Sequence, residues 1–174
     1  MKEWTDDDWQ RRFDILYKCQ LSSLYHRKRE RFYSLLDKVA NALALIAGTS
    51  AMSELLPSAS AKAMAGAVVA AVTLPGIVFT WADKARMHAL LASKFVTLES
   101  EVIGAGVLDA AQLDKFSECA LKLEVEEPPQ LSALTRLCQN EIAYAMGETS
   151  SMRQLSFKER VLAHFIDMPK ASTN

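Results

Sequence analysis

Glycine, histidine and cysteine are scarce in this chain, and their arrangement excludes most of the familiar motifs of catalytic and cofactor sites. The 174 residues include six glycines, which stand alone or in pairs near predicted helix ends and form no glycine-rich phosphate loop. The three histidines lack HExxH spacing, and the three cysteines form no CxxC pair. A GxSxG nucleophile motif is also missing. We therefore predict no catalytic residue, no metal ion, no cofactor and no enzymatic activity.

The sequence also lacks the alternation of apolar and polar residues that is typical of half-buried β-strands. Apolar residues recur at helical spacing instead, and capping or helix-ending residues separate the segments. We therefore predict an all-α fold. The expected N-caps are Thr5, Ser60, Asp109 and Ser156, and the expected helix ends are Gly104, Pro128-Pro129 and Gly147.

Two apolar stripes predict which helix faces are packed. On the N-terminal helix the stripe consists of Trp9, Phe13, Leu16, Tyr17 and Leu24. A second, seam-like stripe consists of Trp81, His88, Leu91, Phe95, Leu98 and Val102. We expect the two helices to pack together, with His88 as a packed residue rather than a ligand. The cysteines read as reduced packing residues, and the acidic run 124–127 beside Pro128-Pro129 reads as a solvated helix end.

Charge is absent from one long stretch, residues 63–82, which covers about 30 Å as a helix of 20 residues. The preceding stretch, residues 39–56, carries a single charge, Glu54, and covers about 27 Å. A short turn-forming segment separates the two, so the helices must run antiparallel. We predict a two-pass transmembrane hairpin over residues 39–82. Both arms are rich in alanine and the mean hydropathy of the chain is +0.02, so a soluble helical bundle that buries this hairpin remains an alternative.

The cations around the hairpin are distributed unevenly. Five precede the first arm and three follow the second, while the connecting segment holds only Lys62. The positive-inside bias then places both termini in the cytoplasm. The residues expected at the membrane interface or on lipid headgroups are Arg27, Lys28, Arg29, Arg31, Lys38, Trp81, Lys84 and Arg86. The net charge of −1 and the mixture of acids and bases in residues 1–38 argue against nucleic acid as a partner.

Small residues recur at every fourth position in both arms and allow close approach of helix backbones. These positions are Ala40, Ala44 and Gly48 in the first arm, and Ala63, Ala67 and Ala71 in the second. The two faces could close the hairpin within one copy or join hairpins of different copies, and we expect a homo-oligomer. Pro75 and Gly76 predict a kink or hinge in the second arm.

The predicted organisation has five parts. Residues 1–38 form an amphipathic cytoplasmic helix, 39–82 the transmembrane hairpin, and 83–104 a helical stalk. Residues 105–168 form a small C-terminal helical region, and 169–174 are expected to be a disordered tail.

Three segments resemble the bacterial SLATT family of two-transmembrane effectors, which accompany nucleotide-signalling defence systems. They are SLYHRKRERFYSLLDKVANALALIAG (23–48), FTWADKARMHALLASKF (79–95) and EEPPQLSALTRLCQNEIAYAMG (126–147). The resemblance implies a pore-forming or membrane-perturbing effector of the bacterial inner membrane in antiphage defence. It also implies a separate nucleotide-signalling or sensor protein as the source of the trigger, because this sequence contains no fused sensor domain. A membrane-anchored interaction or scaffold protein of phage or prophage origin is the alternative from another class, and a soluble bundle adaptor is a third.

Overall fold

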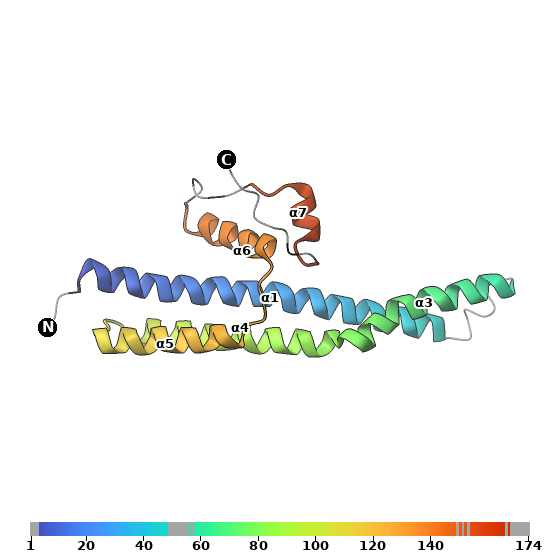
Figure 1. Ribbon diagram of the computed structural model, residues 1–174, viewed down its shortest axis with the longest axis horizontal. Coiled ribbons are helices and arrows are strands. Elements are labelled where there is room, and N and C mark those ends of the chain that lie inside the picture. The colour runs from blue at the N-terminus through green and yellow to red at the C-terminus, as the bar shows by residue number, and fades with distance from the viewer. Residues whose placement is uncertain are drawn as a thin grey trace. The chain divides into compact units, whose positions relative to one another are not determined.

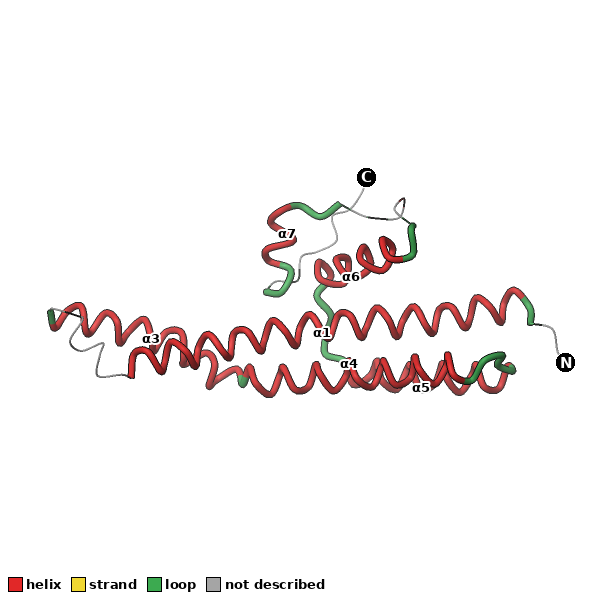
Figure 2. Tube along the Cα trace, turned by 180° about the vertical axis from the view of Figure 1, so that it is seen from behind, coloured by secondary structure: helices red, strands yellow, loops and turns green. Residues whose placement is uncertain are grey.

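A computed structural model describes residues 4–48, 56, 58–148, 150, 152, 154–165 and 167. These residues contain six helices and no strand, so the prediction of an all-α fold is confirmed (Figures 1 and 2). The helices are α1 (Asp6–Gly48), α3 (Ala59–Phe79), α4 (Trp81–Gly104), α5 (Ala110–Glu126), α6 (Ser132–Ala145) and α7 (Phe157–Leu162).

The chain divides into two compact units, and α1 and α4 each contribute to both. We call Met1–Lys28 together with Ala89–Asn174 the helical body, and Arg29–His88 the hairpin unit. The hairpin unit includes the whole of the predicted hairpin, residues 39–82. Within it, α3 runs back in the direction opposite to α1 (Figure 1).

Capping explains where most helices begin. Asp8 accepts hydrogen bonds from the backbone N–H and the hydroxyl of Thr5 ahead of α1. Asp109 with Gln112, and Ser156 with Glu159, form the capping boxes of α5 and α7, as their spacing predicts. The prediction of Ser60 as a cap is wrong. Ser58 caps α3 by accepting from the N–H of Ala61, because the helix begins at Ala59, inside the expected turn.

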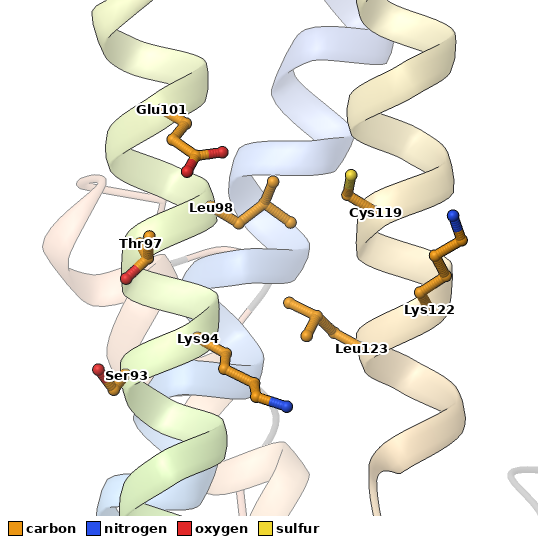
Figure 3. Close-up of a pocket in the computed structure, with 8 residues that line it drawn as sticks. All are labelled: Ser93, Lys94, Thr97, Leu98, Glu101, Cys119, Lys122 and Leu123. Atoms are coloured by element: carbon orange, nitrogen blue, oxygen red, sulfur yellow. The ribbon is translucent and has the colours of Figure 1, made fainter.

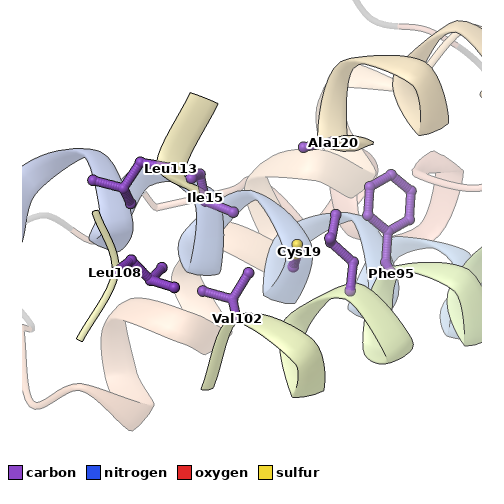
Figure 4. Packing of buried hydrophobic residues seen from close by; sticks show 8 residues of the cluster. Ile15, Cys19, Phe95, Val102, Leu108, Leu113 and Ala120 are labelled. Atoms are coloured by element: carbon purple, nitrogen blue, oxygen red, sulfur yellow. The ribbon is translucent and has the colours of Figure 1, made fainter. Parts of the chain in front are cut away.

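The core of the helical body lies between α1, α4 and α5, where α4 and α5 run alongside the N-terminal part of α1 (Figures 1 and 4). Its buried side chains are Ile15, Cys19, Phe95, Leu98, Val102, Leu108, Leu113 and Ala120. The stripe predicted on α4 is therefore confirmed for its buried members, which are His88, Leu91, Phe95, Leu98 and Val102. The stripe predicted on α1 is wrong at Trp9 and Phe13, which are exposed, because Ile15 and Cys19 set the packed face instead.

A second cluster in the helical body attaches α6 to α1. Tyr25 of α1 packs with Ala133, Leu134 and Cys138 of α6, which are buried. The hydroxyl of Tyr25 accepts a hydrogen bond of 3.0 Å from the backbone N–H of Leu131, just ahead of α6. Side-chain packing and a hydrogen bond from the linker backbone therefore hold the linker between α5 and α6 against α1.

α3, the helix that contains the uncharged stretch, ends earlier than the sequence predicts. Thr80 has φ 46° and ψ 56°, a left-handed conformation that strains a β-branched residue. Its carbonyl accepts from the N–H groups of Asp83 and Lys84 at 3.0 Å, so Thr80 opens α4 while it ends α3. The expectation of one helix running through residue 82 is therefore wrong. α3 continues through Pro75 and Gly76, and the hinge proposed at those two residues stays a prediction.

Candidate functional site

Two of the three cysteines of the helical body, Cys19 and Cys138, supply no reactive thiol. Cys19 and Cys138 are buried, and burial raises the pKa of each thiol to about 12. Because the thiolate is the nucleophile, both residues are inert at neutral pH, as expected for packing residues. Among the described residues, no three side chains of histidine, cysteine, aspartate or glutamate come together as a metal site.

A buried polar cluster in the helical body surrounds the carboxylate of Glu127. His26 Nε2 lies 3.1 Å from one carboxylate oxygen, and Gln130 donates to the other at 2.7 Å. Ser22 also hydrogen-bonds to Glu127. The interpretation of Glu127 as part of a solvated helix end is wrong, since only 6% of its side chain is exposed. Glu127 directly follows the last residue of α5 in an extended conformation, and its contact with α1 is one that no local pattern reveals.

The cluster keeps Glu127 ionised. Burial alone would raise the pKa of its carboxyl, but the hydrogen bonds from His26, Ser22 and Gln130 outweigh burial, and the pKa is lowered from 4.5. The imidazole of His26 also stacks on Phe95 of α4, with ring centroids 6.1 Å apart. The cluster therefore joins α1, α4 and the α5–α6 linker, and we assign it a structural role.

Glu127→Gln is expected to lower the free energy of unfolding of the protein in detergent by about 1–3 kcal/mol. The amide offers one acceptor oxygen where the carboxylate offers two, so it cannot satisfy all the donors. Because the folded pKa is lowered, the stabilisation by Glu127 is complete above pH 4.5 and is lost as the pH falls through the folded value. Denaturant unfolding at several pH values measures both effects.

Glu124→Gln is the matched control, because Glu124 forms an exposed ion pair with Lys18 at 2.5 Å. Such pairs contribute about 0–1 kcal/mol, so this change is expected to be nearly silent. Equal losses from the two variants would contradict the role of Glu127.

A groove between α4 and α5 has a volume of about 370 Å³ (Figure 3). Lys94 and Lys122 line it, together with Glu101, two hydroxyl residues, Cys119 and two leucines. Lys94 pairs with Glu126 at 2.5 Å, and Lys122 pairs with Glu118 at 2.6 Å. Its cations are thus neutralised by the protein itself, and the groove brings together no convergent set of chemical groups.

The hairpin unit presents large apolar side chains to the outside on both of its long helices. We call this set the apolar surface: Leu35, Val39, Leu45 and Ile46 on α1, and Met64, Val68, Leu74 and Val78 on α3. The spacing within each helix places its members along one face. Exposed apolar faces of this extent mark contacts with membranes or other proteins.

The small residues predicted at helix contacts separate into two groups. Ala40 is buried inside the hairpin unit, whereas Ala44, Ala63, Ala67 and Ala71 are exposed. The more covered face of α3 consists of Ala61, Ala65 and Val69. The face formed by Ala63, Ala67 and Ala71 therefore does not close the hairpin, and it is open to contacts between copies. Gly48 lies at the end of α1, and its surroundings are outside the described part of the chain.

The eight residues predicted at lipid headgroups lie in several different environments. Arg27, Arg31, Lys38 and Arg86 are exposed, although Arg86 lies 3.6 Å from Asp83. Lys28 instead pairs with Glu141 of α6 at 2.6 Å. Trp81 is half-buried at the start of α4. The remaining two, Arg29 and Lys84, contact the same aromatic ring.

That ring belongs to Tyr33, and we call Arg29, Tyr33, Lys84 and His88 the Tyr33 node. The guanidinium of Arg29 lies 4.5 Å from the ring centroid and donates a hydrogen bond to the tyrosine hydroxyl. The ammonium of Lys84 lies 5.7 Å from the centroid. The imidazole of His88 stacks on the ring at 5.6 Å and 12°. His88 is buried, so its expected role as a packed residue is confirmed.

Sequence reasoning missed the node. The spacing of Arg29 and Tyr33, four residues apart on one helix, was the available signal. Lys84 and His88 have the same spacing on α4, but their pairing with α1 depends on the tertiary fold.

In the parts of the chain that the structure describes, no helix combines the length and the apolar character required to cross a membrane. Comparison with models of protein families, with curated proteins and with solved structures finds no match.

Proposed function

We propose that the chain is a two-helix membrane effector of bacterial antiphage defence, which perturbs or permeabilises the inner membrane as an oligomer when triggered. The observation that carries the membrane location is the apolar surface of the hairpin unit, which leaves large side chains uncovered on both α1 and α3. A lipid bilayer is the environment in which such a surface is stable without a protein partner. The defence role is an inference from the resemblance to two-transmembrane effectors.

The early end of α3 limits how the hairpin can sit in a bilayer. α3 ends at Phe79, so its uncharged part is residues 63–79, about 26 Å long at 1.5 Å per residue. This is the lower limit of length for a helix that spans a hydrocarbon core, and no described helix joins that length to the apolar character required. A hairpin this short requires local thinning of the bilayer or contact with other copies, and both are compatible with a protein that perturbs membranes.

Exposed charged and small residues of the hairpin unit indicate the orientation of the protein and its partners. The exposed cations Arg31, Lys38 and Arg86 favour a base of the hairpin at the cytoplasmic leaflet, with both termini on that side. The open face of Ala63, Ala67 and Ala71 supplies a surface for homo-oligomers. A separate nucleotide-signalling or sensor protein would supply the trigger.

Membrane fractionation with carbonate washing tests the location, and cysteine labelling tests the orientation. We expect the protein to remain with the membrane after carbonate. In a cysteine-free background, Ser58→Cys should react with a membrane-impermeant thiol reagent added to intact cells, whereas Val125→Cys should not. Both positions are exposed in the structure, so protection reports the membrane rather than burial. Recovery of the whole protein from the soluble fraction would overturn the proposal.

A membrane-anchored scaffold is the second candidate, and exposed aromatic residues of the helical body favour it. Trp9 and Phe13 are exposed on α1, and Phe13 stacks on Tyr17 with centroids 6.0 Å apart. Exposed aromatic rings are typical of protein interfaces. Expression in bacteria distinguishes the two: an effector arrests growth and depolarises cells, whereas a scaffold does neither.

A further inference from the structure

α7 packs against α6 within the helical body (Figure 1). Ala163, which ends α7, is fully buried in the cluster that attaches α6 to α1. Glu159 lies 3.6 Å from the guanidinium of Arg136 on α6. Asp167 accepts hydrogen bonds of 2.6 and 3.0 Å from the hydroxyl and the backbone N–H of Ser132, where α6 begins. These contacts fix which side of α7 points away from α6.

The side of α7 that points away from α6 carries two apolar rings and two cations. We call Phe157, Lys158, Arg160 and Phe165 the α7 patch. Phe157 is 80% exposed and Phe165 is 62% exposed. Lys158 and Arg160 are also exposed, and neither forms an ion pair with any residue that the structure describes. The two acids of segment 156–167 are the ones already engaged by α6. The patch therefore combines apolar surface with uncompensated positive charge.

The interface of a lipid bilayer suits this combination better than other partners. At the boundary of headgroups and acyl chains, apolar rings are buried while basic side chains stay at the level of the phosphates. Phenylalanine rings have no polar group that could hydrogen-bond to a protein or a base. Proteins that hold nucleic acid through charge make about 6–10 phosphate contacts, whereas the α7 patch has two cations. The proposed orientation also places the helical body on the cytoplasmic side, where the leaflet carries anionic lipids.

We infer that the α7 patch docks on the headgroups of anionic lipids, an inference that rests on the proposed membrane location. The contact is peripheral, because α7 has six residues and a length of about 9 Å, far below the thickness of a hydrocarbon core. It also belongs to the helical body rather than to the hairpin unit. Since α7 is held to α6, and α6 to α1 through Tyr25, docking would keep the helical body at the membrane surface.

The test uses the full-length protein in vesicles of phosphatidylcholine alone or with about one-third phosphatidylglycerol. In a cysteine-free background, Phe157→Cys carries a nitrobenzoxadiazole fluorophore, which takes the place of the phenyl ring and emits further to the blue in apolar surroundings. We expect a blue shift in the anionic vesicles and a smaller one in pure phosphatidylcholine. About 0.5 M salt should reverse most of the difference, because it screens the attraction between charges. The same label at Val125→Cys, on the exposed face of α5, should show no shift.

Lys158→Gln is expected to lower the docking equilibrium about fivefold, the worth of one basic residue near an anionic surface. Lys115→Gln is the matched control, because Lys115 is exposed on α5 and forms no ion pair among the described residues, and it should change nothing. Helical circular dichroism shows that each variant is folded. A blue shift in a folded protein that survives Lys158→Gln combined with Arg160→Gln overturns the inference. An equal shift in both kinds of vesicle also overturns it, because the cover of the patch is then not an anionic lipid.

The same fluorophore at Val68→Cys on α3 separates this inference from the proposed location. A blue shift at residue 68 with none at residue 157 contradicts the docking of α7 and leaves the membrane location standing. A shift at neither residue contradicts both. A shift at residue 157 alone supports the docking and contradicts the membrane hairpin.

Discussion

Val68→Asp is expected to remove the protein from the membrane. Val68 lies near the middle of α3 and is 56% exposed, so the change disturbs no packing inside the chain. An aspartate at the centre of a membrane helix costs about 2.5–3.5 kcal/mol, which shifts the insertion equilibrium by about 100-fold. The measurement is the fraction of protein that stays with the membrane after carbonate washing.

Val125→Asp is the control for this experiment. Val125 lies on α5 of the helical body and is 87% exposed, so the same substitution should leave the membrane fraction unchanged. If wild type and both variants are all soluble, the hairpin unit is part of a soluble fold and its apolar surface binds protein. If Val68→Asp stays in the membrane, α3 is outside the hydrocarbon core and the protein binds the bilayer from one side.

The elements that local chemistry determines were predictable. Asp109 and Ser156 cap helices because their partners, Gln112 and Glu159, lie three residues along the chain. The buried face of α4 follows from the spacing of its apolar residues. On α1 the same reasoning failed at Trp9 and Phe13, because Ile15 and Cys19 form the packed face there.

The features that require the tertiary fold were not predictable from one sequence. Glu127 becomes buried because the end of α5 lies against His26, which is 101 residues away in the chain. The Tyr33 node needs α4 to approach α1 in the hairpin unit. The break at Thr80 follows an uninterrupted apolar run, where sequence periodicity gives no sign of a helix end.

Ala63, Ala67 and Ala71 are exposed, which favours the use of this face between copies over its use within the hairpin. Ala67→Leu is expected to abolish depolarisation and growth arrest while the protein stays in the membrane at normal abundance. Ala67 is exposed, so a leucine there fits without strain inside the chain and raises hydrophobicity. Between copies, however, the larger side chain separates helices that approach through Ala63, Ala67 and Ala71.

Disulfide cross-linking of Ala63→Cys in a cysteine-free background measures the assembly directly. With Ala67→Leu added, we expect about a tenfold loss of cross-linked species, which corresponds to ~1.4 kcal/mol of association free energy. Ala40→Leu is the contrasting variant, because Ala40 is buried and overpacking there costs about 1–3 kcal/mol of folding stability. It should therefore lower abundance, whereas Ala67→Leu should not. Full toxicity and full cross-linking of Ala67→Leu would mean that copies assemble through another face, and the proposed assembly surface would be wrong.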